Sequence, residues 1–180
     1  MTDEGFDPND VNWDDFIDDL GGMVNTTTEA VIAEIVDNSL DNHGTRIQIE
    51  FYGTNWNDFA IIVYDDGKGF RNHTHMKKCF DLSGHNAQSG RIGKFNVGLK
   101  LSPLSRCEGV LAHSFGESGE ELFRSLDKKI MKEAGNYGST TTKQPKHATL
   151  NRYISEMLVE GDWITAVALT AFEIRPADSA

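Results

Sequence analysis

One segment, Glu34-Ile35-Val36-Asp37-Asn38-Ser39-Leu40-Asp41, constrains this chain most, because it predicts an amphipathic helix with an unusual polar face. At 3.6 residues per turn, Glu34, Asn38 and Asp41 fall on one side of the helix, and Asp37 borders them. The opposite side is apolar and is formed by Ile32, Ala33, Val36 and Leu40. Taken alone, this pattern is typical of a surface helix whose acidic stripe faces water. The motifs that follow along the chain favour a functional role instead.

Composition predicts a soluble globular protein. The 180 residues are 38% hydrophobic and 25% charged, and no apolar run approaches the length of a membrane helix. Only two cysteines occur, Cys79 and Cys107, so we expect a reducing, cytoplasmic setting and no disulfide framework. The formal net charge of −11 argues against broad affinity for nucleic acids or anionic membranes. A polyphosphate ligand would therefore need local hydrogen-bond donors or a metal ion.

The acidic charge is concentrated at the start of the chain, where no Lys or Arg precedes Arg46. Residues 1–10 are typical of a solvated acidic arm. Apolar residues then recur at helical spacing, and they predict a short docked helix over 11–20: Trp13, Phe16, Ile17 and Leu20. Gly21-Gly22 would end it. We therefore divide the chain into an arm with a short helix, residues 1–20, and one domain, residues 21–180.

The periodicity of the domain predicts alternating helices and strands. A capping-box pattern, Thr26-Thr27-Thr28-Glu29, starts the first helix. We expect helices over 27–42, 99–105, 119–134 and 148–159, and a short helix around Met76–Phe80. The expected strands are 46–52, 59–64, 109–115 and 163–174.

A second motif, Asp65-Asp66-Gly67-Lys68-Gly69, directly follows the strand expected over 59–64. An acidic residue at a strand end, followed by alternate glycines, favours a loop that lets the backbone approach a ligand closely. A simple tight turn explains the same pattern, so the motif is weak by itself.

A third motif, Gly90 to Lys100, joins glycines to the start of an expected helix. Free backbone N–H groups next to a helix N-terminus form an anion site, and Lys94 and Lys100 add positive charge. The segment is not a Walker P-loop, because no Gly-Lys-Ser/Thr follows a spaced glycine.

The order and spacing of the three motifs resemble the Bergerat nucleotide-binding fold of the GHKL ATPase superfamily. This superfamily includes type II topoisomerase ATPase subunits, MutL mismatch-repair proteins, the ninety-kilodalton heat-shock chaperone and MORC proteins. The resemblance spans residues 20–100, and the third motif is most similar to the MORC form. It implies an α/β (α+β) two-layer sandwich with a mixed, mostly antiparallel sheet, helices on one face, and the nucleotide between a helix and a lid.

The resemblance also implies roles for individual residues. Glu34 is the expected general base that activates water, and Asn38 the expected Mg²⁺ ligand. Asp65 is expected to accept a hydrogen bond from adenine, with Gly67 and Gly69 giving the base room. The third motif is expected to bind the phosphates of ATP through Gly93, Lys94, Phe95, Asn96, Val97, Gly98, Leu99 and Lys100. A threonine near the last strand, Thr165 or Thr170, is expected to support adenine.

Two departures from the superfamily pattern leave alternatives open. Asn96 stands where the third motif usually carries glycine, which bears on lid closure. Several family members take a catalytic lysine from a downstream domain, for which we expect no room before Ala180. We therefore expect Mg²⁺-dependent ATP binding and slow hydrolysis, with lid closure or homodimerisation as output, or with a partner protein or missing domain supplying the lysine. The alternatives are a non-hydrolysing nucleotide sensor or interaction module and a histidine-kinase-like catalytic domain, which typically has Asn at the position of Glu34.

Overall fold

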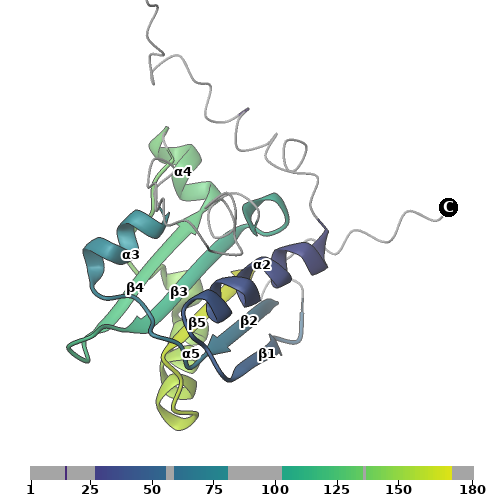
Figure 1. Ribbon diagram of the computed structural model, residues 1–180. Helices are drawn as coiled ribbons and strands as arrows, with labels where there is room; N and C mark the ends of the chain where they lie inside the picture. The colour runs from purple at the N-terminus through teal and green to yellow at the C-terminus, as the bar shows by residue number, and fades with distance from the viewer. Residues whose placement is uncertain (1–14, 16–26, 56–58, 81–102, 136, 172–180) are drawn as a thin grey trace, which may run out of the picture.

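A five-stranded antiparallel sheet forms the centre of the protein (Figure 1). The computed structural model describes residues 15, 27–55, 59–80, 103–135 and 137–171. The strands stand in the order β1-β2-β5-β3-β4, and each described neighbouring pair is antiparallel. Their bounds are β1 Ile47–Tyr52, β2 Ala60–Asp65, β3 Gly109–Phe115, β4 Glu121–Asp127 and β5 Thr165–Thr170.

Helices cover both faces of this sheet. One face carries α2 (Thr28–Asp41), α3 (His73–Phe80), α4 (Lys128–Ala134) and the 3₁₀ turn η2 (Pro103–Ser105), which all contribute to one apolar cluster. The other face carries α5 (Ala148–Glu160), which follows the 3₁₀ turn η3 (Pro145–His147) and packs in a second cluster. In Figure 1 the sheet separates α2 from α5.

The two clusters arise from the alternation of side chains along the strands. In β2, Ile61 and Val63 join α2 and α3, whereas Ala60, Ile62 and Tyr64 join α5. Every residue of β2 is buried, as expected for a strand with helices on both sides. The register then places the last residue of β2, Asp65, beside Thr165 on β5, on the α2 side of the sheet.

Most elements expected from the sequence are confirmed, and with them the α/β fold class and its antiparallel sheet. The helix expected over 27–42 is α2, and its cap residue Thr27 accepts a hydrogen bond from the Ala30 N–H at 3.3 Å. The short helix around Met76–Phe80 is α3. The expectation of helices on one face holds for α2, α3 and α4, while α5 lies on the other. The apolar stripe of α5 was visible in the sequence, but a stripe does not reveal which face of a sheet it covers.

The prediction of a single helix over 119–134 is wrong. Residues 121–127 form β4, and only Lys128–Ala134 are helical, with the Asp127 carboxylate accepting from the Ile130 N–H at 3.2 Å. Leu122, Phe123 and Leu126 fit a helical period, yet the whole run Leu122–Asp127 is buried. A strand that is buried on both sides carries no alternation, so periodicity could not identify it.

Three expectations concern residues that the structure does not describe. The arm, residues 1–20, lies outside the described residues except for Asp15, which is helical. The third motif lies wholly outside them, and of the helix expected over 99–105 only the 3₁₀ turn Pro103–Ser105 is described. Within the described parts of the chain, no helix is long and apolar enough to cross a bilayer.

Candidate functional site

The polar face of α2 supplies the first part of the candidate site. Glu34 and Asn38 are both half-buried and stand one helical turn apart, a spacing that puts their Cβ atoms about 6 Å from each other. Burial raises the pKa of the Glu34 carboxyl, and the negative charge of Asp37 raises it further. A carboxylate with a raised pKa takes up a proton more readily, which suits a general base.

The end of β2 supplies the second part, Asp65. This carboxylate is only 5% exposed, and it accepts hydrogen bonds from the Ser39 hydroxyl at 3.0 Å and from the Gly67 N–H at 2.9 Å. Burial raises its pKa, while these two hydrogen bonds act in the opposite direction. The side chain is therefore held in one orientation at the floor of the site.

Ser39 is a site residue that the sequence reasoning missed. The buried stripe of α2 is formed by Val31, Ile35 and Ser39, one position away from the predicted apolar side. Its hydroxyl bonds both the Ile35 carbonyl, at 3.1 Å, and Asp65. The sequence feature that could have indicated Ser39 is its position four residues after Ile35, which places a small hydroxyl side chain on the same face of the helix as an apolar one.

The two glycines of the second motif are required by their surroundings. A Cβ on Gly67 would lie 2.8 Å from the Asn42 carbonyl oxygen, and one on Gly69 would lie 2.7 Å from the Ser114 hydroxyl. Gly69 also has φ +63°, in the left-handed region that favours glycine. The backbone of this turn therefore passes close to α2 and β3.

A small cavity joins these two parts of the site. Its volume is about 30 Å³, and its lining brings motif residues from α2 and β2 together with β5: Ile35, Asn38, Ser39, Asn42, Asp65, Gly69, Phe70, Thr165 and Val167. The Thr165 hydroxyl lies 3.1 Å from that of Ser114. Thr170 instead bonds the Gly109 carbonyl, at the far end of β5. Of the two threonines considered from the sequence, Thr165 is therefore the one beside Asp65.

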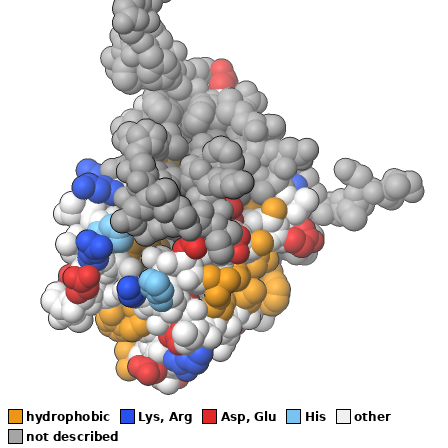
Figure 2. All heavy atoms as spheres, in the orientation of Figure 1, with side chains coloured by type: hydrophobic (Ala, Val, Ile, Leu, Met, Phe, Trp, Pro, Cys, Tyr) orange, Lys and Arg blue, Asp and Glu red, His pale blue; other side chains and the backbone are white. Residues whose placement is uncertain are grey.

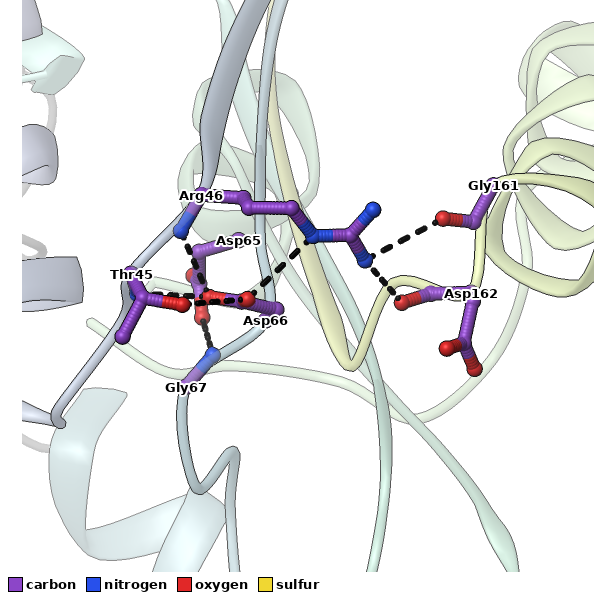
Figure 3. A network of polar contacts seen from close by, with 7 residues as sticks. All are labelled: Thr45, Arg46, Asp65, Asp66, Gly67, Gly161 and Asp162. Carbon is purple, nitrogen blue, oxygen red and sulfur yellow. Dashed lines mark hydrogen bonds and ion pairs between the residues drawn. The ribbon is translucent and has the colours of Figure 1, made fainter.

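A dense polar network fixes the backbone next to Asp65 (Figure 3). The Asp66 carboxylate accepts from the N–H groups of Thr45 and Arg46, at 2.6 and 2.8 Å, and from the Thr45 hydroxyl at 2.8 Å. These bonds hold the pKa of Asp66 far below its usual range. The Arg46 side chain reaches Asp66 at 3.3 Å and the Asp162 carbonyl at 2.8 Å, and it lies over the Trp163 ring. Arg46 thus ties the second motif to the turn between α5 and β5.

A larger cavity, of about 430 Å³, lies elsewhere. It opens near the start of β2 and the end of β5, and among the described residues neither of the first two motifs lines it: its walls are Tyr52, Gly53, Thr54, Phe59, Lys146, His147, Thr149, Leu150 and Thr170. Size alone would favour this cavity as a ligand site. Its one ammonium group, on Lys146, is already paired with the Asp127 carboxylate. The smaller cavity holds the convergent carboxylate, amide and glycine groups, so we take it as the candidate site.

Among the residues that the structure describes, no three His, Cys, Asp or Glu side chains are grouped to hold a metal ion. The phosphate-binding residues expected from the third motif, from Gly93 to Lys100, lie outside the described residues. The described geometry therefore brings together Asn38, Asp65, Gly69 and Thr165 around one cavity.

Comparison with known proteins identifies the family of the chain. No curated protein matches the chain. A family model described as "Histidine kinase-, DNA gyrase B-, and HSP90-like ATPase" matches residues 26–157, well over half of the chain. That range contains α2, the turn after β2 and the third motif, so the match supports ATP as the ligand of this fold. The chain therefore belongs to the histidine kinase-, DNA gyrase B- and HSP90-like ATPase family, within the GHKL superfamily.

Proposed function

We propose that this chain binds Mg²⁺-ATP between α2 and the turn after β2 and hydrolyses it slowly. The observation that carries the proposal is that the site combines two carboxyl groups with an amide side chain on neighbouring elements. Glu34 has a raised pKa, and Asn38, one turn away, shares a cavity with the buried Asp65. In this proposal Glu34 is the general base, Asn38 is the oxygen ligand of Mg²⁺, and Asp65 is the carboxylate that recognises adenine.

Each residue has a distinct role in this proposal. Glu34 orients the attacking water and accepts its proton. The side-chain oxygen of Asn38 is suited to Mg²⁺, which prefers oxygen ligands and usually takes others from water and phosphates. Asp65 accepts from the adenine amino group, and Thr165 stands beside it.

Two further parts of the proposal concern residues beyond the described site. The third motif, from Gly93 to Lys100, would bind the phosphates and close over them as a lid, with Asn96 in place of a glycine. A lysine that completes turnover would come from a downstream domain or a partner protein. The cavity of about 30 Å³ is close to the volume of one water molecule, so we expect adenine binding to widen it.

The first test measures ATP binding and turnover together. ATP with Mg²⁺ should raise the unfolding temperature, because a ligand at 100 times its Kd stabilises by about 2.7 kcal/mol. Glu34→Gln should keep this shift and lose at least about 100-fold in phosphate release. Asp41→Asn, on the same helix face, is the matched control and should retain turnover.

The outcomes separate the candidate functions. No shift at millimolar ATP contradicts nucleotide binding, and loss of the shift in Glu34→Gln assigns Glu34 a structural role. Binding without turnover in the wild type would favour the sensor or interaction module. Phosphate found on a histidine side chain, instead of in solution, would favour the kinase-like alternative, which the carboxylate at Glu34 argues against.

A further inference from the structure

The corner formed by α2 and β1 exposes an unusual amount of apolar surface. Leu40 of α2 is 49% exposed, and Ile49 and Phe51 of β1 are 43% and 66% exposed. Among the described residues only one other large apolar side chain, Val159, is as open. Figure 2 shows hydrophobic side chains gathered on the side of the molecule where α2 and β1 lie in Figure 1. We call Leu40, Ile49 and Phe51 the α2–β1 patch.

The patch lies at the solvent-exposed edge of the apolar cluster between α2 and the sheet. Ile49 pairs with Val63 and Phe51 with Ile61, and both partners belong to the core cluster under α2. The Phe51 ring also stacks on Phe59, with centroids 6.2 Å apart. Since β1 is the edge strand, no further described strand covers this margin. A covering element would therefore extend an existing core and remove apolar surface from water.

The chain itself contains a segment with a matching surface. Residues 13–20 place Trp13, Phe16, Ile17 and Leu20 on one side of a helix, and four aspartates on the other. Asp15, which belongs to the acidic side, is described as helical and exposed. The apolar side needs a partner, because a helix this short is marginal in water without tertiary contacts.

Lengths allow this segment to reach the patch. A helix over 13–20 is about 12 Å long, and β1 spans about 13 Å from Ile47 to Phe51. The seven residues 21–27, which include Gly21-Gly22, can extend to about 23 Å before α2 begins. The chain reverses between α2 and β1, so the end of β1 lies toward the beginning of α2 (Figure 1). A segment that precedes α2 can therefore fold back along β1.

We propose that residues 13–20 dock as an amphipathic helix on the α2–β1 patch of the same molecule. Trp13, Phe16, Ile17 and Leu20 cover the patch, and the aspartates face water. A second copy of the chain is the less suitable occupant, because two molecules of net charge −11 repel each other. The linker also holds the segment at millimolar effective concentration near the patch. The inference does not depend on nucleotide binding.

Hydrogen exchange of the full chain, without nucleotide, tests this docking. Amides of residues 13–20 should exchange at least about tenfold more slowly than in an unstructured peptide. Phe51→Asp should abolish most of that protection. Val159→Asp, at an equally exposed site on α5, is the matched control and should leave it unchanged. Exchange at the unstructured rate in the wild type, or protection that survives Phe51→Asp, overturns the proposal.

A reciprocal measurement follows the patch instead of the segment. Ile49→Cys, in a Cys79→Ser background, provides a thiol in the patch, because the remaining Cys107 is buried. Trp13→Asp should speed its labelling several-fold, whereas Asp14→Asn, on the acidic side, should not. Unchanged labelling in Trp13→Asp contradicts the docking. If the thiol is labelled more slowly at higher protein concentration, the patch is covered by a second copy of the chain, and the docking within one molecule is wrong.

Discussion

At the scale of single residues, the two carboxylates of the site are set apart by their surroundings. Asp65 is buried and held by Ser39 and Gly67, whereas Glu34 is half-buried and faces the charge of Asp37. Both have raised pKa values, with burial as the largest cause. Only Glu34 stays open enough to exchange a proton with water, so its titration should govern turnover.

Asp37→Asn should shift the acid side of the ATPase pH profile to lower pH. Glu34 must be ionised to accept a proton from water, and removal of the neighbouring charge lowers its pKa. The measurement is kcat/KM against pH for the wild type and the variant. A shift to higher pH, or no shift, would show that Glu34 does not set this limb.

Comparison of Gly69 with Gly135 separates backbone strain from steric crowding in the second motif. Their φ angles are +63° and +62°, but a Cβ on Gly135 meets no atom within 4 Å, whereas one on Gly69 meets Ile164 and Ser114 at 2.7 Å. Gly135→Ala should therefore cost about 1 kcal/mol of unfolding free energy, from backbone strain alone. Gly69→Ala should cost roughly 2–4 kcal/mol, because overpacking adds to the strain. Equal losses in urea denaturation would contradict the close approach seen at Gly69.

At the scale of elements, sequence patterns predicted the helices and strands that bury only one side or that begin at a recognisable capping residue. The capping residue Thr27 and the alternation in β1 identified their elements. β4 was missed because a strand buried on both sides shows no period of two, and Leu122 and Leu126 suit a helix equally well. Asn38 and Asp65 were predicted as site residues from their motifs, and both line the cavity. Ser39 was not predicted, because its place in the site depends on how α2 is rotated about its axis. The apolar pattern of the sequence missed that rotation by about one residue.

His113 connects two elements and should make stability depend on pH. It lies buried on β3, and its Nε2 is 3.0 Å from the Asn151 side-chain oxygen on α5. Burial lowers its pKa from 6.5 to about 4, so between these values the unfolded chain binds a proton that the folded chain does not. Unfolding free energy should fall by about 3 kcal/mol as pH drops from 7 to 4 through this residue. His113→Gln should remove that part of the slope in denaturation curves.

The Asp66 network should act on stability through its backbone bonds. Asp66→Ala removes the carboxylate that accepts from the backbone N–H groups of Thr45 and Arg46, so it should lower the unfolding temperature. Asp66→Asn keeps one oxygen for the two N–H groups and should lie between Ala and the wild type. Because the pKa of Asp66 is lowered on folding, its contribution is present above pH 4 and fades in more acidic solution. An unfolding temperature that is the same in all three proteins would show that the network adds nothing.

At the scale of the whole molecule, the sheet brings three distant segments to one end. α2 contributes Asn38, β2 contributes Asp65, and β5 contributes Thr165, although more than 120 residues separate the first from the last. Helices on both faces hold this end of the sheet, and Arg46 joins the second motif to the α5 side. We therefore expect this end of the sheet to recognise adenine through the Asp65 carboxylate.

Calorimetric titration of ATP and GTP, each with Mg²⁺, tests the recognition of adenine by Asp65. A carboxylate at Asp65 accepts a hydrogen bond from the amino group of adenine but repels the carbonyl oxygen that guanine carries at the same position. The wild type should therefore bind ATP at least about tenfold more tightly than GTP. Asp65→Asn should narrow this difference, because an amide can donate as well as accept. Equal affinity of the wild type for the two nucleotides, or no binding of ATP, would contradict the account.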